Sequence, residues 1–193
     1  MGIPRDGLPQ IAMSGRSNVG KSTLLNALCR SKVARTSAAP GKTRLANIYR
    51  LTVEGGGPGG KWGLYLVDLP GYGYARGGAD AAEELRAVAE AYFAQAGTHA
   101  APGFRPAALL LVDSRHPGLD SDLQAARWLE SMDVNYQVVA TKVDKLSRSE
   151  RARNMKALEL TLGRPPLPVS AAGGEGMDAL WKTIVSLART ARG

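Results

Sequence analysis

Residues 15–22 carry the strongest chemical signal in the sequence. They read Gly-Arg-Ser-Asn-Val-Gly-Lys-Ser, which matches GxxxxGK[ST], and they lie between an apolar, strand-like run at 10–14 and a helical pattern at 21–30. In this context the glycines allow backbone N–H groups to turn toward phosphates, and the helix start adds partial positive charge. We therefore predict a phosphate loop, in which Lys21 bridges the outer phosphates of a nucleoside triphosphate and Ser22 ligates Mg²⁺.

An acidic residue and a glycine, Asp68 and Gly71, follow the strand-like run at 62–68. They would lie at the carboxyl edge of a parallel sheet, where ligands bind. Asp68 suits the outer coordination shell of the metal, and the unhindered N–H of Gly71 suits contact with the terminal phosphate. A DxxG run alone is explained about as well by a turn. Together with the phosphate loop it favours a nucleotide site.

Nucleotide selectivity is predicted to depend on Asp144, in the run Thr-Lys-Val-Asp at 141–144 that ends the strand-like segment 136–141. A carboxylate there accepts hydrogen bonds from N1–H and the exocyclic amine of guanine, while the aliphatic stem of Lys142 covers the ring. As an isolated tetrad this run would more simply cap a helix. Its position after a phosphate loop and DxxG favours base recognition.

Ser170 and Ala171 complete the series, after a strand-like run at 167–170. A backbone N–H at this point can donate to the guanine oxygen. The signal is weak alone and depends on its order and location in the chain. GTP rather than ATP is the predicted ligand, because adenine lacks the donors that Asp144 would read.

Apolar runs and helical patterns alternate along the chain. Helical patterns separate most of the strand-like runs, and each opens near a Gly, Ser or Asp. This alternation predicts an α/β fold with a largely parallel sheet and helices on both faces. Strands are expected at 10–14, 44–53, 62–68, 107–113, 136–141 and 167–170, and helices at 21–30, 80–96, 120–131, 149–162 and 177–189.

The second and third strands are an exception, because only residues 54–61 separate them. That segment is too short for a crossover helix, so the two strands are expected to form an antiparallel hairpin at one edge of the six-stranded sheet. Its glycines predict a flexible tip rather than a second phosphate cradle, since no helix with Lys and Ser follows. We expect one domain over residues 1–193, with 1–9 as a short N-terminal extension.

The composition is that of a globular domain: 193 residues, 44% hydrophobic and 22% charged. No apolar run approaches the ~20 residues of a membrane helix. The N-terminus lacks the apolar core of a secretory signal, and the single Cys29 cannot form an internal disulfide, so we expect a cytoplasmic protein with Cys29 as a small buried hydrophobe. The net charge of +8 fits either a polyanion partner or a biased composition.

With these motifs the chain resembles the translation-factor-like P-loop GTPases and, within them, the EngB family (also called YihA or YsxC) of bacterial ribosome-assembly GTPases. The resemblance covers nearly the whole chain, although the family usually carries a longer segment before the first strand and a shorter hairpin tip. The run 68–75 is the most specific, because ordinary regulatory GTPases do not continue in this way. The motifs are residues 15–22, Arg-Thr-Ser at 35–37 leading to Pro-Gly-Lys-Thr at 40–43, Asp-Leu-Pro-Gly-Tyr-Gly-Tyr-Ala at 68–75, and Asp-Ser-Arg-His-Pro at 113–117.

The resemblance implies which residues bind the nucleotide and the metal. Thr43 would be the switch threonine that closes over Mg²⁺ and the terminal phosphate, and with Lys21 and Gly71 it would support catalysis. Mg²⁺ would be held by Ser22 and Thr43, with Asp68 in the outer shell. GTP or GDP would be contacted by Gly15, Arg16, Ser17, Asn18, Val19, Gly20, Lys21, Ser22, Thr23, Gly41, Lys42, Thr43, Arg44, Leu45, Asp68, Leu69, Pro70, Gly71, Thr141, Lys142, Val143, Asp144, Val169, Ser170 and Ala171.

The resemblance also implies a biological role. The protein would be a monomeric, nucleotide-dependent switch in maturation of the large ribosomal subunit or its precursor, with rRNA as a partner and a link to cell division and septation. Two alternatives stay open: a GTPase that acts on a non-ribosomal partner such as a cell-division or membrane-associated protein, and a nucleotide-dependent modifying enzyme, for which no spare domain exists. The basic residues Arg148, Arg151, Arg153 and Lys156 would form either a solvated face or an rRNA contact.

Hydrolysis is expected to be slow, because Tyr72 stands where many GTPases place a Gln after DxxG. A phenol cannot orient the attacking water in the same geometry, so catalysis would depend on charge compensation by Lys21 and Mg²⁺ and on a group brought by the partner. Tyr72 could instead be a packing residue or an RNA contact. Asn18 could ligate K⁺ in place of an arginine finger, as the resemblance suggests, or only buttress the loop.

Overall fold

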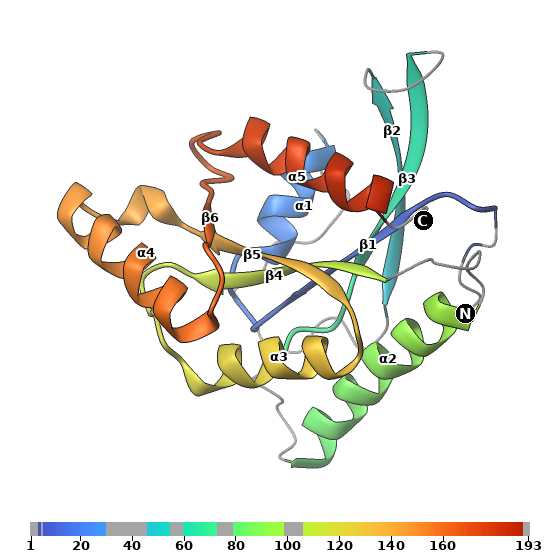
Figure 1. The fold of residues 1–193 in the computed structure, drawn as a ribbon, viewed down its shortest axis with the longest axis horizontal. Coiled ribbons are helices and arrows are strands. Elements are labelled where there is room, and N and C mark those ends of the chain that lie inside the picture. The colour runs from blue at the N-terminus through green and yellow to red at the C-terminus, as the bar shows by residue number, and fades with distance from the viewer. Residues whose placement is uncertain are drawn as a thin grey trace.

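A computed structural model describes Pro4 and residues 6–29, 46–54, 60–72, 79–98 and 106–190. These residues form an α/β domain around a six-stranded sheet with the strand order β2-β3-β1-β4-β5-β6 (Figure 1). The predicted fold class is therefore confirmed. The strands are β1 (Gln10–Gly15), β2 (Asn47–Glu54), β3 (Lys61–Asp68), β4 (Ala107–Asp113), β5 (Asn135–Thr141) and β6 (Leu167–Pro168).

Neighbouring strands pair in parallel except for β2 and β3, which form the predicted antiparallel hairpin with β2 at the edge of the sheet. In the parallel register Met13 is opposite Asp68, and Asp113 is opposite Thr141. The carboxyl ends of β1, β3, β4 and β5 consequently meet at one edge of the sheet. This arrangement brings together motifs that are far apart in the sequence.

Helices cover both faces of the sheet, as Figure 1 shows. One core, with Met13 and Leu109, lies beneath α1 (Lys21–Cys29) and α5 (Met177–Thr190). The other core, with Ala12 and Leu110, lies beneath α2, α3 and α4. Because helices cover both of its faces, every residue of β4 is buried, as expected of a central parallel strand. The remaining helices are α2 (Ala79–Thr98), α3 (Asp120–Ser131), α4 (Arg148–Leu162) and the short 3₁₀ helix η1 (Val143–Lys145).

Most element boundaries lie within two residues of the prediction; α2, for example, spans Ala79–Thr98 rather than 80–96. β6 spans Leu167–Pro168 rather than residues 167–170, because the Ser170 N–H donates to Glu175 O in a turn instead of continuing the sheet. β2 begins at Asn47, and the predicted start at residues 44–45 lies outside the described residues, as does the hairpin tip at 55–59.

Cys29, expected to be a small buried hydrophobe, is half-buried and packs against the core beneath α1 and α5. Burial raises the pKa of its thiol. A neutral thiol behaves as a small hydrophobe, so the predicted structural role agrees with its surroundings.

The turn after β6 requires glycine at position 176. Gly176 has a φ of 75°, and a Cβ there would lie 2.2 Å from Pro168 O. Gly176→Ala should lower the free energy of unfolding by ~3 kcal/mol or more, because left-handed strain adds to a clash with the backbone.

Gly174→Ala is the matched control for this turn, since Gly174 has a φ of 76° but nothing within 4 Å of its added Cβ. We expect that control to cost about 1 kcal/mol in urea unfolding. Equal losses in the two variants would contradict the proposed clash.

Candidate functional site

The predicted phosphate loop connects β1 to α1 through a tight turn. Val19 N donates to Arg16 O at 3.2 Å, and Leu24 N donates to Gly20 O at 2.9 Å as the helix begins. A Cβ on Gly15 would lie 2.9 Å from Leu111 O, and Gly20 has a φ of 105°, so both positions favour glycine on steric grounds. These contacts form the tight turn at the start of α1, where the unpaired backbone N–H groups of a helix can bind anions; phosphate binding by this loop stays a prediction.

Lys21 and Asp68 form a buried ion pair at the bottom of this loop. Lys21 Nζ contacts Asp68 Oδ1, and the two residues are 8% and 2% exposed. Ser22, one position further along α1, is half-buried. The predicted cation, hydroxyl and carboxylate therefore come from neighbouring positions at the same sheet edge.

The DxxG segment lies directly against the phosphate loop. Tyr72 O accepts a hydrogen bond from Ser17 N at 3.0 Å, and residues 16 and 72 form a parallel β-bridge. A Cβ on Gly71 would lie 3.0 Å from Ser17 N, so a larger residue would push the two segments apart. Leu69 and Pro70 are buried beneath them.

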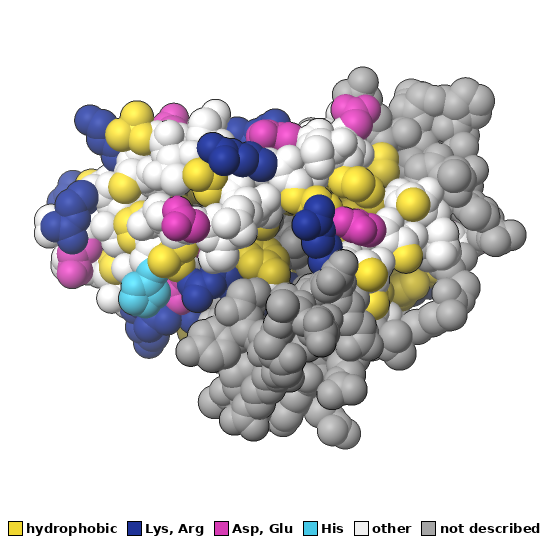
Figure 2. Space-filling model, turned by 90° about the horizontal axis from the view of Figure 1, so that it is seen from below, with side chains coloured by type: hydrophobic (Ala, Val, Ile, Leu, Met, Phe, Trp, Pro, Cys, Tyr) yellow, Lys and Arg dark blue, Asp and Glu magenta, His cyan; other side chains and the backbone are white. Residues whose placement is uncertain are grey.

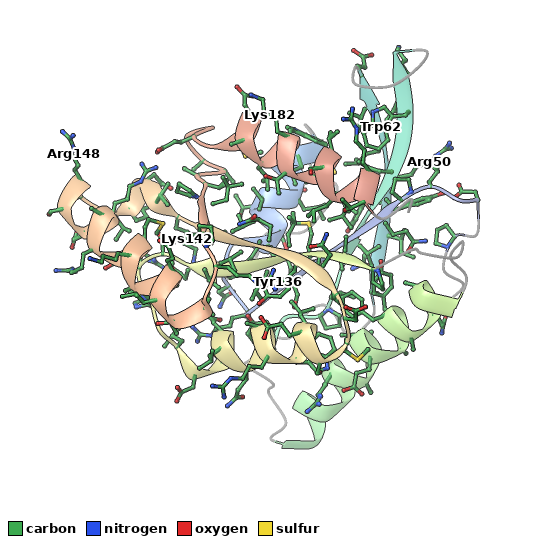
Figure 3. The ribbon with its side chains drawn as sticks, in the orientation of Figure 1. Arg50, Trp62, Tyr136, Lys142, Arg148 and Lys182 are labelled. Carbon is green, nitrogen blue, oxygen red and sulfur yellow. The ribbon has the colours of Figure 1, made fainter. Side chains whose placement is uncertain are left out.

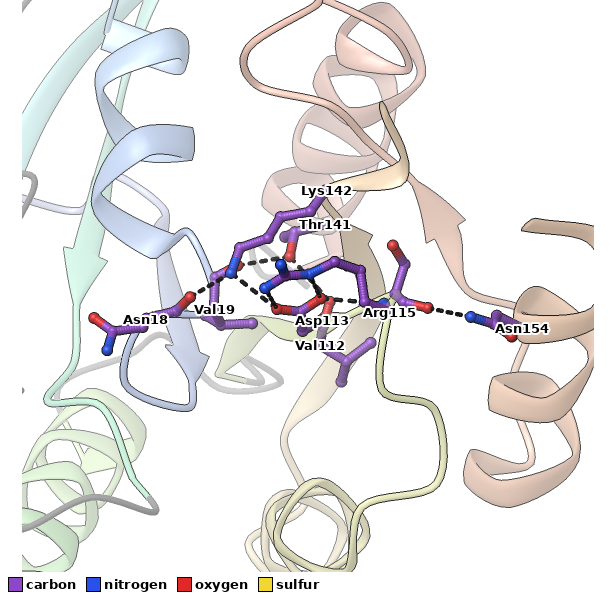
Figure 4. Close-up of polar contacts among 9 residues, drawn as sticks. Asn18, Val19, Val112, Asp113, Arg115, Thr141, Lys142 and Asn154 are labelled. Carbon is purple, nitrogen blue, oxygen red and sulfur yellow. Dashed lines mark hydrogen bonds and ion pairs between the residues drawn. The ribbon is translucent and has the colours of Figure 1, made fainter. Parts of the chain in front are cut away.

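The predicted base-reading motif at 141–144 is attached to the phosphate loop by two of its residues (Figure 4). Thr141 Oγ1 lies 2.6 Å from Val19 O, close enough to donate a hydrogen bond. Lys142 adopts a left-handed backbone with φ 61°, and its Nζ donates to Asn18 O at 2.6 Å. Figure 4 shows the stem of Lys142 crossing from the end of β5 toward Asn18 in the phosphate loop.

Asp113 is an additional anchor, which the sequence reasoning quoted only as part of a family motif. Its carboxylate accepts from Lys142 Nζ at 2.8 Å and from Nε and Nη2 of Arg115 at 2.9 and 2.7 Å. Burial alone would raise the pKa of Asp113, but the hydrogen bonds from Arg115 and Lys142 outweigh burial and hold the pKa well below its usual range. The carboxylate is therefore charged when it holds Lys142.

Asp144 is oriented by a residue of the last predicted motif. Ser170 Oγ donates to Asp144 Oδ1 at 2.7 Å, and Ser170 Oγ in turn accepts from Gly173 N at 3.0 Å. The hydrogen bond from Ser170, helped by the nearby Lys145, lowers the pKa of the Asp144 carboxyl. The sequence reasoning predicted both segments but not this bond between them, because a loop serine offers no signal of its partner.

The other predicted site residues divide into three groups. Val19, Val143 and Val169 are buried and support the loops from below. Thr23 and Asn18 are exposed, and Ala171 is half-buried. Outside the described residues lie Gly41, Lys42, Thr43, Arg44 and Leu45.

Comparison with known proteins agrees with this geometry. A family model described as 50S ribosome-binding GTPase matches residues 10–142. A probable GTP-binding protein EngB from Solibacter usitatus is 42% identical over 188 residues, which cover 95% of this chain and 88% of that relative. The chain belongs to the EngB family of P-loop GTPases. Its EngB relative in Chlorobaculum tepidum is 40% identical over 186 residues, covering 95% of this chain and 89% of that protein. The protein is thus a GTP-binding GTPase, as predicted.

Solved structures show the same fold. A crystal structure of a probable GTP-binding protein EngB aligns with a TM-score of 0.67 at 23% identity, covering 93% of this chain and 98% of that one. Era from Aquifex aeolicus bound to GDP and AlF4⁻ aligns with a TM-score of 0.74 at 22% identity, covering 92% of this chain and 56% of Era. Among the described residues of this EngB-family chain, no helix is long and apolar enough to cross a membrane.

Removal of the Asp113 carboxylate should destabilise this EngB-family domain. Asp113→Ala leaves Arg115 and Lys142 without their shared anion, and we expect the free energy of unfolding to fall by about 2–3 kcal/mol at pH 7. This figure is below that of a fully buried pair because Arg115 and Lys142 are themselves 41% and 26% exposed along their side chains.

Glu54→Ala provides the control for Asp113→Ala, because Glu54 and Lys61 form an exposed ion pair at 3.1 Å. Its loss should cost less than about 1 kcal/mol in the same urea titration. An Asp113→Ala variant as stable as Glu54→Ala would show that Asp113 is not an anchor.

Proposed function

We propose that this GTPase is a nucleotide-dependent switch in assembly of the large ribosomal subunit. The observation that carries the ribosomal part is the match of residues 10–142 to a family model described as 50S ribosome-binding GTPase. Era, whose fold is similar, has been crystallised with MgGDPNP and nucleotides 1506–1542 of 16S ribosomal RNA, which supports an rRNA partner. A role in ribosome assembly would place the protein in the cytoplasm. A link to cell division and septation stays a prediction from the family resemblance.

In the proposed complex, the phosphates of GTP lie in the turn formed by residues 15–20. Lys21 would exchange the Asp68 carboxylate for phosphate oxygens, which are equally good anionic partners. Guanine would lie over the Lys142 stem, with N1–H and the amine on Asp144. The bond from Ser170 to Asp144 supports this assignment, because it leaves the carboxylate charged and oriented.

The residues at the phosphate loop fit Mg²⁺. This ion prefers oxygen ligands and usually keeps waters and phosphates in its coordination shell. Ser22 offers a hydroxyl and Asp68 a carboxylate, and no group of three or more His, Cys, Asp or Glu among the described residues could hold a metal without the nucleotide. When bound, Mg²⁺ would neutralise charge on the phosphates; Thr43 is the further ligand that the resemblance implies.

Hydrolysis is proposed to be slow without the partner. Tyr72 is turned toward α3, where its OH contacts Asp122 at 3.1 Å, so it does not supply the group that a Gln would. The backbone oxygen of Asn18 accepts a hydrogen bond from Lys142 Nζ, and the Asn18 side chain points away from that lysine in Figure 4. That amide oxygen would be the K⁺ ligand in the proposed alternative to an arginine finger.

The proposed partner surface lies on α4. Arg148, Arg153 and Lys156 are exposed on this helix, whereas Arg151 is half-buried and pairs with Glu175. Figure 3 shows Arg148 directed outward from the end of α4, and Figure 2 shows Lys and Arg side chains gathered at the end of the molecule where α4 lies. A phosphate backbone is the partner that such side chains favour.

Asp144→Asn should exchange guanine for xanthine specificity. An amide can donate where the carboxylate only accepts, so GTP affinity should fall by about 100-fold or more while affinity for xanthosine triphosphate rises. Isothermal titration with GTP, ATP and xanthosine triphosphate measures both. Asp178→Asn, an exposed carboxylate at the start of α5, should bind GTP like the parent. Unchanged GTP affinity in Asp144→Asn would remove Asp144 from the base site.

Binding to the large subunit or its precursor should depend on both nucleotide and salt. Sedimentation with a GTP analogue should recover more protein on the particle than sedimentation with GDP, because only different affinities can shift the switch. In the triple alanine variant of Arg148, Arg153 and Lys156, binding should weaken, and the slope of log K against log salt should flatten by ~0.7–0.9 for each phosphate group that the variant no longer binds.

The matched control is the double alanine variant of Lys61 and Lys182, two exposed cations outside α4. It should sediment like the parent protein. If the salt slope of binding is unaltered in the α4 variant, the cations of α4 do not contact phosphates and serve only solubility. If binding is equal with the GTP analogue and with GDP, the protein is not a nucleotide-dependent switch.

A further inference from the structure

Asp122 is a buried carboxylate that the nucleotide motifs do not include. It lies in the first turn of α3 and is 2% exposed. Its Oδ1 accepts the Tyr72 hydroxyl at 3.1 Å, while its Oδ2 is buried with no hydrogen-bond partner among the described residues. A buried carboxylate is costly to keep. This one is attached to the residue that follows DxxG.

Tyr72 is consequently held at two points. Its backbone oxygen accepts Ser17 N of the phosphate loop at 3.0 Å, and its side chain reaches Asp122 on α3. The ring also packs against the core beneath α2 and α3. Both contacts are made by Tyr72, the residue directly after Gly71, so they fix the Tyr72 backbone and, through the Gly71–Tyr72 peptide, constrain Gly71.

The charges around Asp122 come from three elements. Burial raises the pKa of Asp122 to about 6, against the hydrogen bond from Tyr72 and the charge of Arg16 in the phosphate loop, which lower it; Asp113 at the end of β4 raises it further. Arg16 Nε is itself buried without a hydrogen-bond partner among the described residues. At neutral pH the carboxylate is thus charged and faces one phenol and one guanidinium.

We propose that Asp122 is a positioning residue for GTP hydrolysis: by holding the Tyr72 side chain it fixes the DxxG segment against the phosphate loop. It does not touch the nucleotide. It acts through Tyr72 on the Gly71 N–H, the group assigned to the terminal phosphate. The proposal depends on the GTPase activity of the family and on that role of Gly71, and it does not depend on the ribosomal partner.

The expected effect is on the rate constant rather than on nucleotide binding. Lys21, Ser22 and the base motif hold GTP without Tyr72, so KM should change by less than about threefold. A small displacement of a group that meets the reacting phosphate lowers the rate strongly. Tyr72→Phe and Asp122→Leu should each reduce kcat about tenfold or more, since each removes the hydrogen bond.

A double variant separates positioning from simple stability. Each single change leaves a buried polar group without its partner, whereas Tyr72→Phe with Asp122→Leu removes both groups. The melting temperature of the double variant should recover toward that of the parent, while kcat stays as low as in either single variant. Asp122→Asn, which can still accept the Tyr72 hydroxyl, should keep kcat within about threefold.

Asp120→Leu is the matched control, because Asp120 is exposed in the same turn of α3; it should leave kcat and KM unchanged. The pH profile adds a second readout: a protonated Asp122 keeps a carbonyl oxygen that accepts the Tyr72 hydroxyl, as the amide of Asp122→Asn does, so the ratio of parent to Asp122→Asn kcat should stay within about threefold across pH 6. Recovery of kcat together with stability in the double variant, or additive losses from the two single changes, would overturn the proposal. Loss of GTP binding in every variant would instead count against the assignment of the phosphate site.

Discussion

The side chain of Lys142 joins the phosphate loop to the end of β4, and the arrangement of the proposed nucleotide site depends on this contact. The backbone of Lys142 is left-handed, a conformation that costs a non-glycine residue roughly 1–2 kcal/mol. Two charge-assisted hydrogen bonds, at 2.6 Å to Asn18 O and 2.8 Å to Asp113 Oδ2, offset that strain. Because β4 lies between β1 and β5 in the sheet, a carboxylate at the end of β4 is the natural bridge between the phosphate loop and the base motif.

Two buried carboxylates near this edge, Asp113 and Asp122, have pKa values shifted in opposite directions for physical reasons. Asp113 has two cations and a backbone N–H within hydrogen-bond distance, and these keep it ionised despite burial. Asp122 has one neutral donor, Tyr72, and its pKa is raised to about 6. The first carboxylate therefore behaves as a permanent structural anion. The second takes up a proton near pH 6.

The fold could be predicted from sequence because each strand and helix has its own local signal. The apolar run of β4 and the short separation of β2 from β3 were sufficient for a parallel sheet with an edge hairpin. The sequence also predicted that the phosphate loop and the two motifs after it lie close together, because parallel strands end at the same edge of the sheet. The apolar pattern predicted a β6 that is two residues too long, because the chain turns after Pro168.

The contacts between motifs could not be predicted in this way. Tyr72 and Asp122 lie 50 positions apart, and Asp122 looks like one of two acidic residues that favour the start of α3. The bond from Ser170 to Asp144 spans 26 positions and has no periodic signature. Which polar side chains meet is decided by the packing of the helices on the sheet, and a single sequence does not record that packing.

The attachment of α4 connects the proposed partner surface to the proposed guanine side of the site. Asn154, on the buried side of α4, donates to Ser114 O at 2.9 Å, and Ser114 follows Asp113 directly in the chain (Figure 4). The exposed cations of α4 are thus separated from Lys142 by two hydrogen bonds, Asn154 to Ser114 and Lys142 to Asp113. A partner that displaced α4 would strain the loop after β4 and, through the ion pair of Arg151 with Glu175, the turn that holds Ser170. Since linkage is reciprocal, a nucleotide that stiffens Lys142 and Asp113 would equally resist that displacement.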